Sequence, residues 1–280
     1  MSEPYNISTA PIQTGPVVHP VAKRSYSRIY GRHEVLDGEY KLYQKLLAEF
    51  LGTALFVWGV ISPNVFFQDY PPLFPDVPVI RLIGPAFTGG LIIYLFGRVS
   101  GAHFNPAVSL ALLLRQKLSA MEFVLYVIAQ LLGSIFGCVL LGLIRRGKFK
   151  YMAGTQMQEY LITTAGGTGK NAMCYISALI SEIIGTFVLI MFILASCERD
   201  NYLGPMLGLA FASVIIAMST AGGPISGCSL NPARSFGPAL VQVMGKGNND
   251  PIEQIWIYIV GPFVGAVLAA FVWPIFLYGE

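Results

Sequence analysis

Long apolar stretches constrain this 280-residue chain more than any other feature of its sequence. A helix needs about 20 apolar residues to cross the hydrocarbon of a bilayer. Six stretches reach or approach that length: 46–62, 82–97, 123–144, 173–197, a segment that begins near Gly204, and one within 254–279. Charged residues make up 12% of the chain, against about 25% in soluble domains. The chain is therefore predicted to be an all-α integral membrane protein with six transmembrane helices.

The tripeptide Asn-Pro-Ala occurs twice, at 105–107 and 231–233, each time shortly after a Ser-Gly pair. Asn caps the free N–H groups at a helix start, and Pro fits the first helical turn. The apolar run after the first copy is too short to span a bilayer, and the fifth apolar stretch is too long for one helix. We therefore expect two re-entrant half-helices, at 105–115 and 231–241. Either copy alone would be better explained as a plain turn or helix cap.

The two halves of the chain match each other. Glu49 and Glu182 each open a Glu-x-x-Gly-Thr segment, and the segments 129–134 and 261–266 are also similar. The matched points lie 133, 126 and 132 residues apart at the glutamates, the Asn-Pro-Ala copies and the third pair. Such nearly constant spacing predicts an internal duplication, with repeats at 45–150 and 151–280 after a tail at 1–44. Three spans per copy invert the second repeat, which places the irregular segments together at the midplane.

Two half-helix N-termini that meet head to head form a positive zone with two Asn amide donors. Water accepts hydrogen bonds there, whereas a cation or hydronium ion is repelled. The extended residues before each Asn need partners for their carbonyl groups, which a file of water would provide. These carbonyl groups belong to Gly101, Ala102, His103, Gly227, Cys228 and Ser229.

The paired Asn-Pro-Ala motifs and Glu-x-x-Gly-Thr openings resemble those of the aquaporins, the major intrinsic protein family, over about residues 45–276. The resemblance implies six tilted helices plus two half-helices in an inverted repeat, assembled in lipid as a homotetramer with one pore per subunit. It implies passive, osmotically driven transport of water with exclusion of protons and cations, and no cofactor.

The resemblance also implies roles for single residues. Asn105 and Asn231 would be the central donors, and Arg234 the cation-excluding donor of an outer constriction. Cys228 matches the constriction position that makes many members sensitive to mercury. The pore lining would include Gly101, Ala102, His103, Gly227, Ser229, Phe56 and Leu189.

Two constriction positions depart from the family pattern. An aromatic residue or His is usual where this chain has Pro85, and the nearest ring is Phe87. Water-selective members carry His where this chain has Ser219. A constriction built this way leaves open a broader pore that also passes hydrogen peroxide, ammonia or small polyols such as glycerol.

Several residues also have plainer interpretations. Glu49 and Glu182 are acids in apolar helices, which suits either a proton relay or support for the re-entrant loops by hydrogen bonds; we favour support. Arg234 would otherwise extend its charge to the membrane interface, and Cys228 would simply pack. A structural and a pH-sensing role for His103 both stay open.

Other classes of function find less support. The net charge of +3 is too small to suggest nucleic acid, and no nucleophile–base pair or metal cluster suggests an enzyme or a metal site. A secondary active transporter also uses inverted repeats and broken helices, but it needs titrating or ion-binding residues at the midplane. A junction or scaffold protein with a closed pore stays possible on sequence grounds.

The tail at 1–44 carries a basic residue three positions before Ser27, in Arg24-Ser-Tyr-Ser. We hypothesise that it covers the cytoplasmic mouth and moves on phosphorylation of Ser25 or Ser27, near Tyr26 and Tyr30; a disordered tail is the alternative. Its Lys and Arg residues favour a cytoplasmic N-terminus, although a basic cluster at 145–150 opposes this. The plasma membrane is the default location, with an internal membrane as the alternative.

Overall fold

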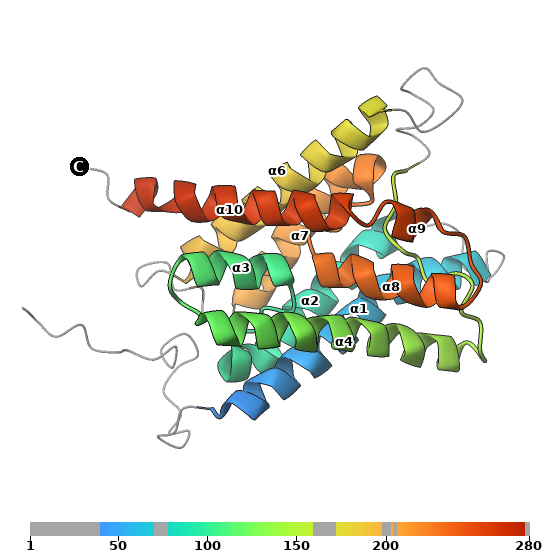
Figure 1. The fold of residues 1–280 in the computed structure, drawn as a ribbon, viewed down its shortest axis with the longest axis horizontal. Helices are drawn as coiled ribbons and strands as arrows, with labels where there is room; N and C mark the ends of the chain where they lie inside the picture. Colours follow the sequence, from blue (N-terminus) through green and yellow to red (C-terminus); the bar gives the residue numbers. More distant parts are fainter. Residues whose placement is uncertain (1–39, 70–77, 159–171, 198–202, 204–205, 278–280) are drawn as a thin grey trace, which may run out of the picture.

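The computed structural model describes residues 40–69, 78–158, 172–197, 203 and 206–277 (Figure 1). The described residues form helices and loops, with no strand among them. The regulatory candidates Ser25, Tyr26, Ser27 and Tyr30 lie outside these ranges.

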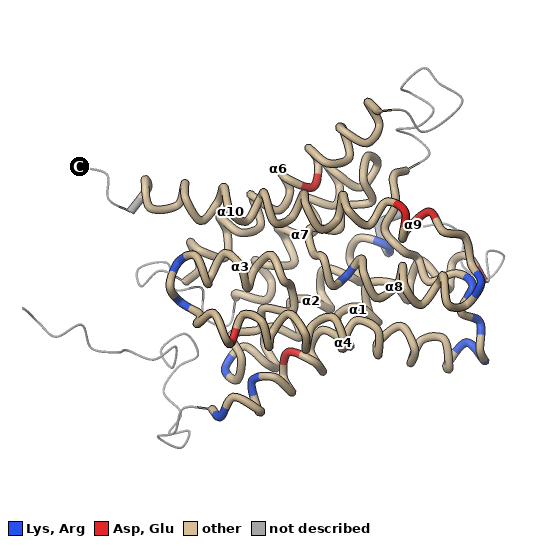
Figure 2. Tube along the Cα trace, viewed as in Figure 1, with Lys and Arg blue, Asp and Glu red and all other residues tan. Residues whose placement is uncertain are grey.

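Within the described ranges, six helices are long and apolar enough to cross a membrane, as predicted. They are α1 (Leu42–Asp69), α2 (Pro78–Ser100), α4 (Ala120–Ile144), α6 (Ala172–Ser196), α7 (Leu207–Ser226) and α10 (Ile257–Leu277). The start of α1 and the end of α10 lie at one end of the bundle, and α4 ends at the opposite end (Figure 1). That opposite end is here named the Asp69 end, because Asp69, the last residue of α1, binds Arg145 just after α4. Lys and Arg gather at these two ends (Figure 2). The all-α prediction with six spans is confirmed.

The first span is longer than its predicted range of 46–62, because α1 continues through Pro63 to Asp69. Membrane helices tolerate proline where neighbouring groups satisfy the backbone. Pro63 leaves the carbonyl oxygen of Gly59 without its helical N–H partner, and the hydroxyl group of Ser62 donates to the preceding carbonyl oxygen, that of Trp58, at 2.5 Å.

Two short helices start at the Asn-Pro-Ala motifs: α3 (Pro106–Leu114) and α8 (Pro232–Met244). Asn105 and Asn231 are their N-caps, and each side-chain oxygen accepts a bond from the backbone N–H two residues on, at 2.9 Å. With 9 and 13 residues, neither helix covers the roughly 30 Å of a bilayer core at about 1.5 Å per residue. A further short helix, α9 (Asp250–Glu253), precedes α10.

The two halves pack in the same way. A Cβ atom on Gly133 of α4 would overlap the carbonyl oxygen of Phe50 on α1, and one on Gly265 of α10 would lie 2.5 Å from that of Ile183 on α6. Small residues thus let each helix pair approach closely. The halves meet where α2 crosses α7, and there a Cβ atom on Gly208 would lie 2.6 Å from the carbonyl oxygen of Gly90.

The segment 145–158 after α4 folds back over α8. The guanidinium group of Arg145 donates to both carboxylate oxygens of Asp69 at 2.9 Å. Farther along, the side-chain oxygen of Gln242 on α8 accepts the backbone N–H of Met152 at 2.9 Å. These bonds bring Thr155 against the first turn of α8.

Candidate functional site

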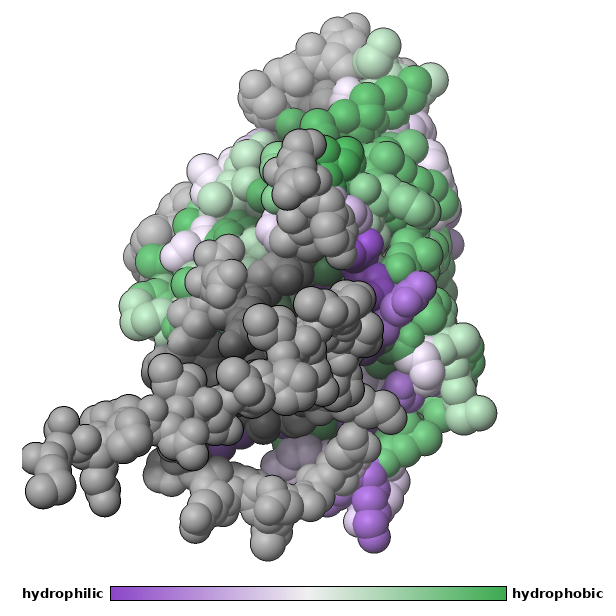
Figure 3. Space-filling model, turned by 90° about the vertical axis from the view of Figure 1, so that its left-hand side faces the viewer, coloured by the Kyte–Doolittle hydropathy of each residue, from purple (hydrophilic) through white to green (hydrophobic). Residues whose placement is uncertain are grey.

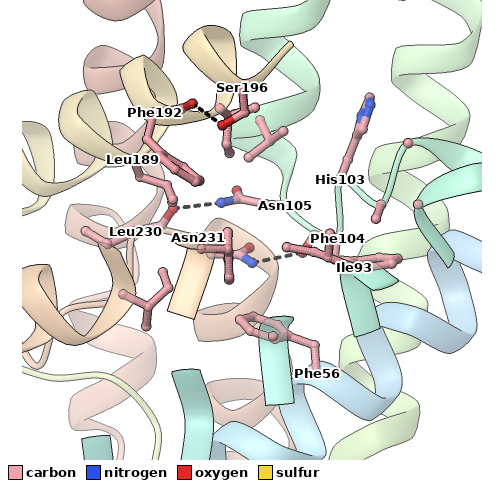
Figure 4. A pocket seen from close by; sticks show the side chains of 18 of the residues that line it. Phe56, Ile93, His103, Phe104, Asn105, Leu189, Phe192, Ser196, Leu230 and Asn231 are labelled. Carbon is pink, nitrogen blue, oxygen red and sulfur yellow. Dashed lines mark hydrogen bonds between the residues drawn. The ribbon is translucent and has the colours of Figure 1, made fainter. Parts of the chain in front are cut away.

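The N-termini of α3 and α8 meet through their capping asparagines. The amide nitrogen of Asn105 donates to the carbonyl oxygen of Leu230 at 2.9 Å, and that of Asn231 donates to the carbonyl oxygen of Phe104 at 2.8 Å (Figure 4). Each Asn therefore caps its own helix with oxygen and binds the opposite loop with nitrogen. An amide nitrogen carries two N–H donors, so one donor of each Asn remains for a molecule in the space between them.

Both loops before the asparagines adopt a left-handed backbone at equivalent positions. Such conformations are costly for residues other than glycine and need support from the surrounding structure. The φ values are 88°, 53° and 49° at Gly101, Ala102 and Phe104, and 79°, 49° and 57° at Gly227, Cys228 and Leu230.

Glu49 supports the first loop from α1, where its side chain is fully buried. Its carboxyl oxygens accept the hydroxyl group of Ser100 at 2.6 Å and the backbone N–H groups of His103 and Phe104 at 3.0 and 2.8 Å. The side-chain amide of Gln130 on α4 adds a fourth bond at 2.8 Å. The carboxyl group thus anchors the loop by satisfying its buried donors.

Glu182 on α6 does the same for the second loop. It accepts the hydroxyl group of Ser226 at 2.7 Å and the backbone N–H groups of Ser229 and Leu230 at 2.8 and 2.7 Å. The glycine of each Glu-x-x-Gly-Thr segment has a packing role nearby. A Cβ atom on Gly185 would lie 2.6 Å from the side chain of Leu230, and one on Gly52 would overlap the ring of Phe104.

A cavity of about 110 Å³ surrounds the paired asparagines. One water needs about 10–15 Å³ of space measured at water centres, so the cavity has room for several. Most of its wall is apolar. The predicted lining residues that it contains are Phe56, Gly101, Ala102, His103, Leu189 and Ser229. Gly227 is not among the residues of this cavity; it ends α7 in a left-handed conformation.

Two regular rows of residues supply much of the wall and were missed in the sequence. They lie four residues apart, so each row follows one face of its helix. The rows are Gly89, Ile93 and Gly97 on α2 and Leu207, Phe211 and Ile215 on α7. Their spacing of four residues is present in the sequence. It identifies pore-lining residues only once the pore-facing side of each helix is known.

Pro85 and Ser219 extend these two rows by one turn, beyond the cavity. The side chain of Ser219 lies near the thiol of Cys228. Arg234, in the first turn of α8, donates from its guanidinium group to the hydroxyl oxygen of Thr155. Thr155 also accepts the hydroxyl group of Ser235 at 2.9 Å. The predicted constriction residues on α7, α8 and the second loop therefore lie near one another, joined to the segment 145–158.

Phe87 is a wrong prediction. Two residues from Pro85 correspond to about 200° around a helix, so Phe87 faces the opposite side of α2. It lies in a row with Ile83, Leu91 and Leu95, all between 42 and 59% exposed. The aromatic residue nearest to Pro85 in the sequence is thus on the outward-facing surface of the bundle.

His103 is buried within a polar cluster that the sequence did not reveal. Its Nδ1 atom lies 3.0 Å from the hydroxyl oxygen of Ser109, which accepts a bond from Gln130 at 3.0 Å. Two tyrosines also hold the loops: Tyr126 donates to the carbonyl oxygen of Ser100 at 2.9 Å, and Tyr258 to that of Ser226 at 2.7 Å. The tyrosines stand 132 residues apart, as the third matched pair does, so the repeat could have identified them.

Six spanning helices around two capped half-helices define a membrane channel by fold and site. The family model for major intrinsic protein matches residues 38–273. Nodulin-26 from Glycine max is 34% identical over 240 residues, covering 85% of this chain and 79% of its own. "Probable aquaporin PIP2-7" from Oryza sativa subsp. japonica is 31% identical over 253 residues, covering 87% and 82%.

Fold comparison agrees with these matches. The X-ray structure of the aquaglyceroporin from Plasmodium falciparum superposes with a TM-score of 0.71 at 20% identity, covering 83% of this chain and 96% of that chain. The chain belongs to the major intrinsic protein family, whose members are channels and not enzymes. The family resemblance seen in the sequence is confirmed.

Proposed function

We propose that the chain forms a pore for passive, osmotically driven water transport that excludes protons and cations. One observation carries this proposal: the side chains of Asn105 and Asn231 line one cavity while each is bonded to the opposite loop. Their remaining N–H donors offer hydrogen bonds to water. Because much of the surrounding wall is apolar, few other groups compete for that water.

Charge supports the exclusion of cations. Each half-helix N-terminus carries about half a positive charge, and the two meet at the asparagines. Arg234 adds a full charge three residues after Asn231. A water that accepts hydrogen bonds from both asparagines is also poorly oriented to pass a proton along a file.

A broader pore is the second candidate. Pro85, Ser219 and Cys228 occupy predicted positions of the constriction, and none of their side chains is a bulky aromatic ring. Relatives of this chain include both named aquaporins and nodulin-26, and its fold matches that of a named aquaglyceroporin. Small neutral solutes such as hydrogen peroxide, ammonia or glycerol would then pass with water.

The assembly we propose is a homotetramer in lipid, with the N-terminus in the cytoplasm and the plasma membrane as its location. Many large apolar side chains of the spanning helices are exposed, and the flank at the right of Figure 3 is largely hydrophobic. Within one chain, only 6% of the apolar 18-residue segment of α7 is buried, and only 28% of the corresponding segment of α2. Lipid or neighbouring copies must cover these faces, and the mass of the detergent-solubilised protein distinguishes the two.

Proteoliposomes containing the full-length chain test the transport proposal. Stopped-flow light scattering would follow water, glycerol and peroxide fluxes in parallel, with empty liposomes as control. Fast water flux with little glycerol flux supports a water pore, and comparable rates for all three support the broader pore. Water flux no faster than that of empty liposomes contradicts both.

A further inference from the structure

Side chains from two helices converge on Gly89 of α2. A Cβ atom placed on Gly89 would lie 2.7 Å from a ring carbon of Phe211 on α7 and 3.3 Å from a ring carbon of Phe56 on α1. Real Cβ atoms essentially never show contacts under 3.0 Å. The ring of Phe211 therefore occupies the space into which any other side chain at position 89 would project.

This meeting point belongs to the wall of the central cavity. Gly89, Phe56 and Phe211 all line the cavity that holds Asn105 and Asn231. Gly89 also belongs to the channel-facing row of α2. Two rings thus reach one glycine of this wall from two other helices. Aromatic side chains are stiff because they turn about only two torsions.

We propose that Phe211, seated against Gly89 and backed by Phe56, is a size-selective constriction of the pore, separate from the group around Arg234. The proposal rests on the pore function proposed above and adds a specificity-determining residue to it. Water passes the rings, whereas a polyol the size of glycerol is retarded by them.

The two channel-facing rows support this division of roles at the ends that lie toward the Asp69 end of the bundle. Pro85 and Ser219 stand there, and neither side chain can fill the pore as a ring does. Phe211 stands 20 residues before Asn231, as Pro85 does before Asn105. The duplicated position thus carries a ring in one half of the chain only, and that ring lies in the cavity.

Replacing the ring tests the constriction directly. Proteoliposomes with the full-length Phe211→Ala variant should show a several-fold rise in the ratio of glycerol to water permeability. Phe87→Ala is the matched control, since it removes the same ring from the outward face of α2, and it should leave the ratio unchanged. Equal ratios in the wild type, Phe211→Ala and Phe87→Ala would overturn the proposal.

A second variant controls for the possibility that the cavity wall closes in around the small alanine side chain of Phe211→Ala. Phe211→Leu keeps most of the apolar volume but lacks the flat ring, and it should also raise the ratio. The glycine gives an independent measurement: Gly89→Ala should lower the thermal stability, and Phe211→Ala in the same chain should relieve that loss. Additive effects of the two changes would show that the ring and the glycine do not meet.

The outcome separates the constriction from the pore function on which it rests. A wild-type chain without water flux would contradict the proposed function. In that case, opening of solute flux by Phe211→Ala alone would still support a constriction at the rings, and no opening would overturn it.

Discussion

The two re-entrant loops share one backbone frame and differ in the side chains around it. Each has a buried glutamate that accepts a serine hydroxyl group and two backbone N–H groups, and each has a tyrosine bonded to the carbonyl oxygen of that serine. Each ends at an Asn that caps a half-helix and binds the other loop. The frame therefore combines backbone N–H groups, which any sequence would present, with matching glutamate, serine, tyrosine and asparagine side chains in both halves.

The side chains next to this frame diverge. In the first loop, His103 contacts Ser109, which also binds Gln130 of α4. In the second loop, Ser229 lies 2.5 Å from Ser235, which donates to Thr155 at 2.9 Å. Arg234 is present in the second half only, where the first half has Val108. The duplicated frame builds the pore, and the divergent side chains give its two ends different chemistry.

Loss of a loop anchor should have the largest effect. Glu49→Leu and Glu182→Leu each leave several buried donors without an acceptor, which should destabilise the protein by about 3 kcal/mol or more. The Glu49 variant should lose more, because it loses four bonds against three. Thermal unfolding of detergent-solubilised protein measures this, with the exposed Glu253→Leu as control. Melting temperatures equal to that of the control would show that the loops do not need these anchors.

Crowding the matched helix contacts should have the next largest effect. Gly133→Ala and Gly265→Ala push a Cβ atom into a neighbouring backbone, and overpacking of this kind costs about 1–3 kcal/mol. The two variants should lose similar amounts of stability, since they disrupt the same contact in each half. Gly223→Ala is the control, because nothing lies within 4 Å of its added Cβ atom. A loss confined to one variant would mean that the halves do not pack equivalently.

The contact between Thr155 and Arg234 has no counterpart in the first half, so its loss should change selectivity more than stability. Thr155→Val keeps the shape but removes the acceptor of the guanidinium group, which should raise the proton leak and reduce water flux several-fold. Thr155→Ser keeps the hydroxyl group and should behave as the wild type. If valine and serine behave alike, this contact does not position Arg234.

The smallest effect on water flux itself is expected from removal of a thiol. Cys228 takes the place of Ala102 in the first loop, and mercuric ion should block water flux through it. Cys228→Ala, which restores the residue of the first loop, should remove most of this sensitivity while leaving flux nearly unchanged. Any remainder should disappear with Cys197→Ala, because Cys197 also lines the cavity. Full sensitivity in the double variant would place the reactive thiol elsewhere.

The frame could be predicted because three sequence patterns indicate it: the lengths of the apolar stretches, the two capping motifs and the nearly constant spacing of the repeat. The contacts of Thr155 could not, since the segment 145–158 has no periodicity and reaches α8 only in three dimensions. Phe87 was wrong for a related reason, because a neighbour in sequence faces the other side of a helix. Phe211 was missed because nothing in its local sequence shows that Gly89 makes room for its ring.

We propose that the two capped half-helices form a pore that passes water and rejects protons. Water permeability and proton leak measured on the same proteoliposomes, by light scattering and an enclosed pH-sensitive dye, test it most directly. We expect water flux well above that of empty liposomes, with a proton leak equal to theirs. A proton leak that rises together with water flux, or no added water flux at all, would contradict it.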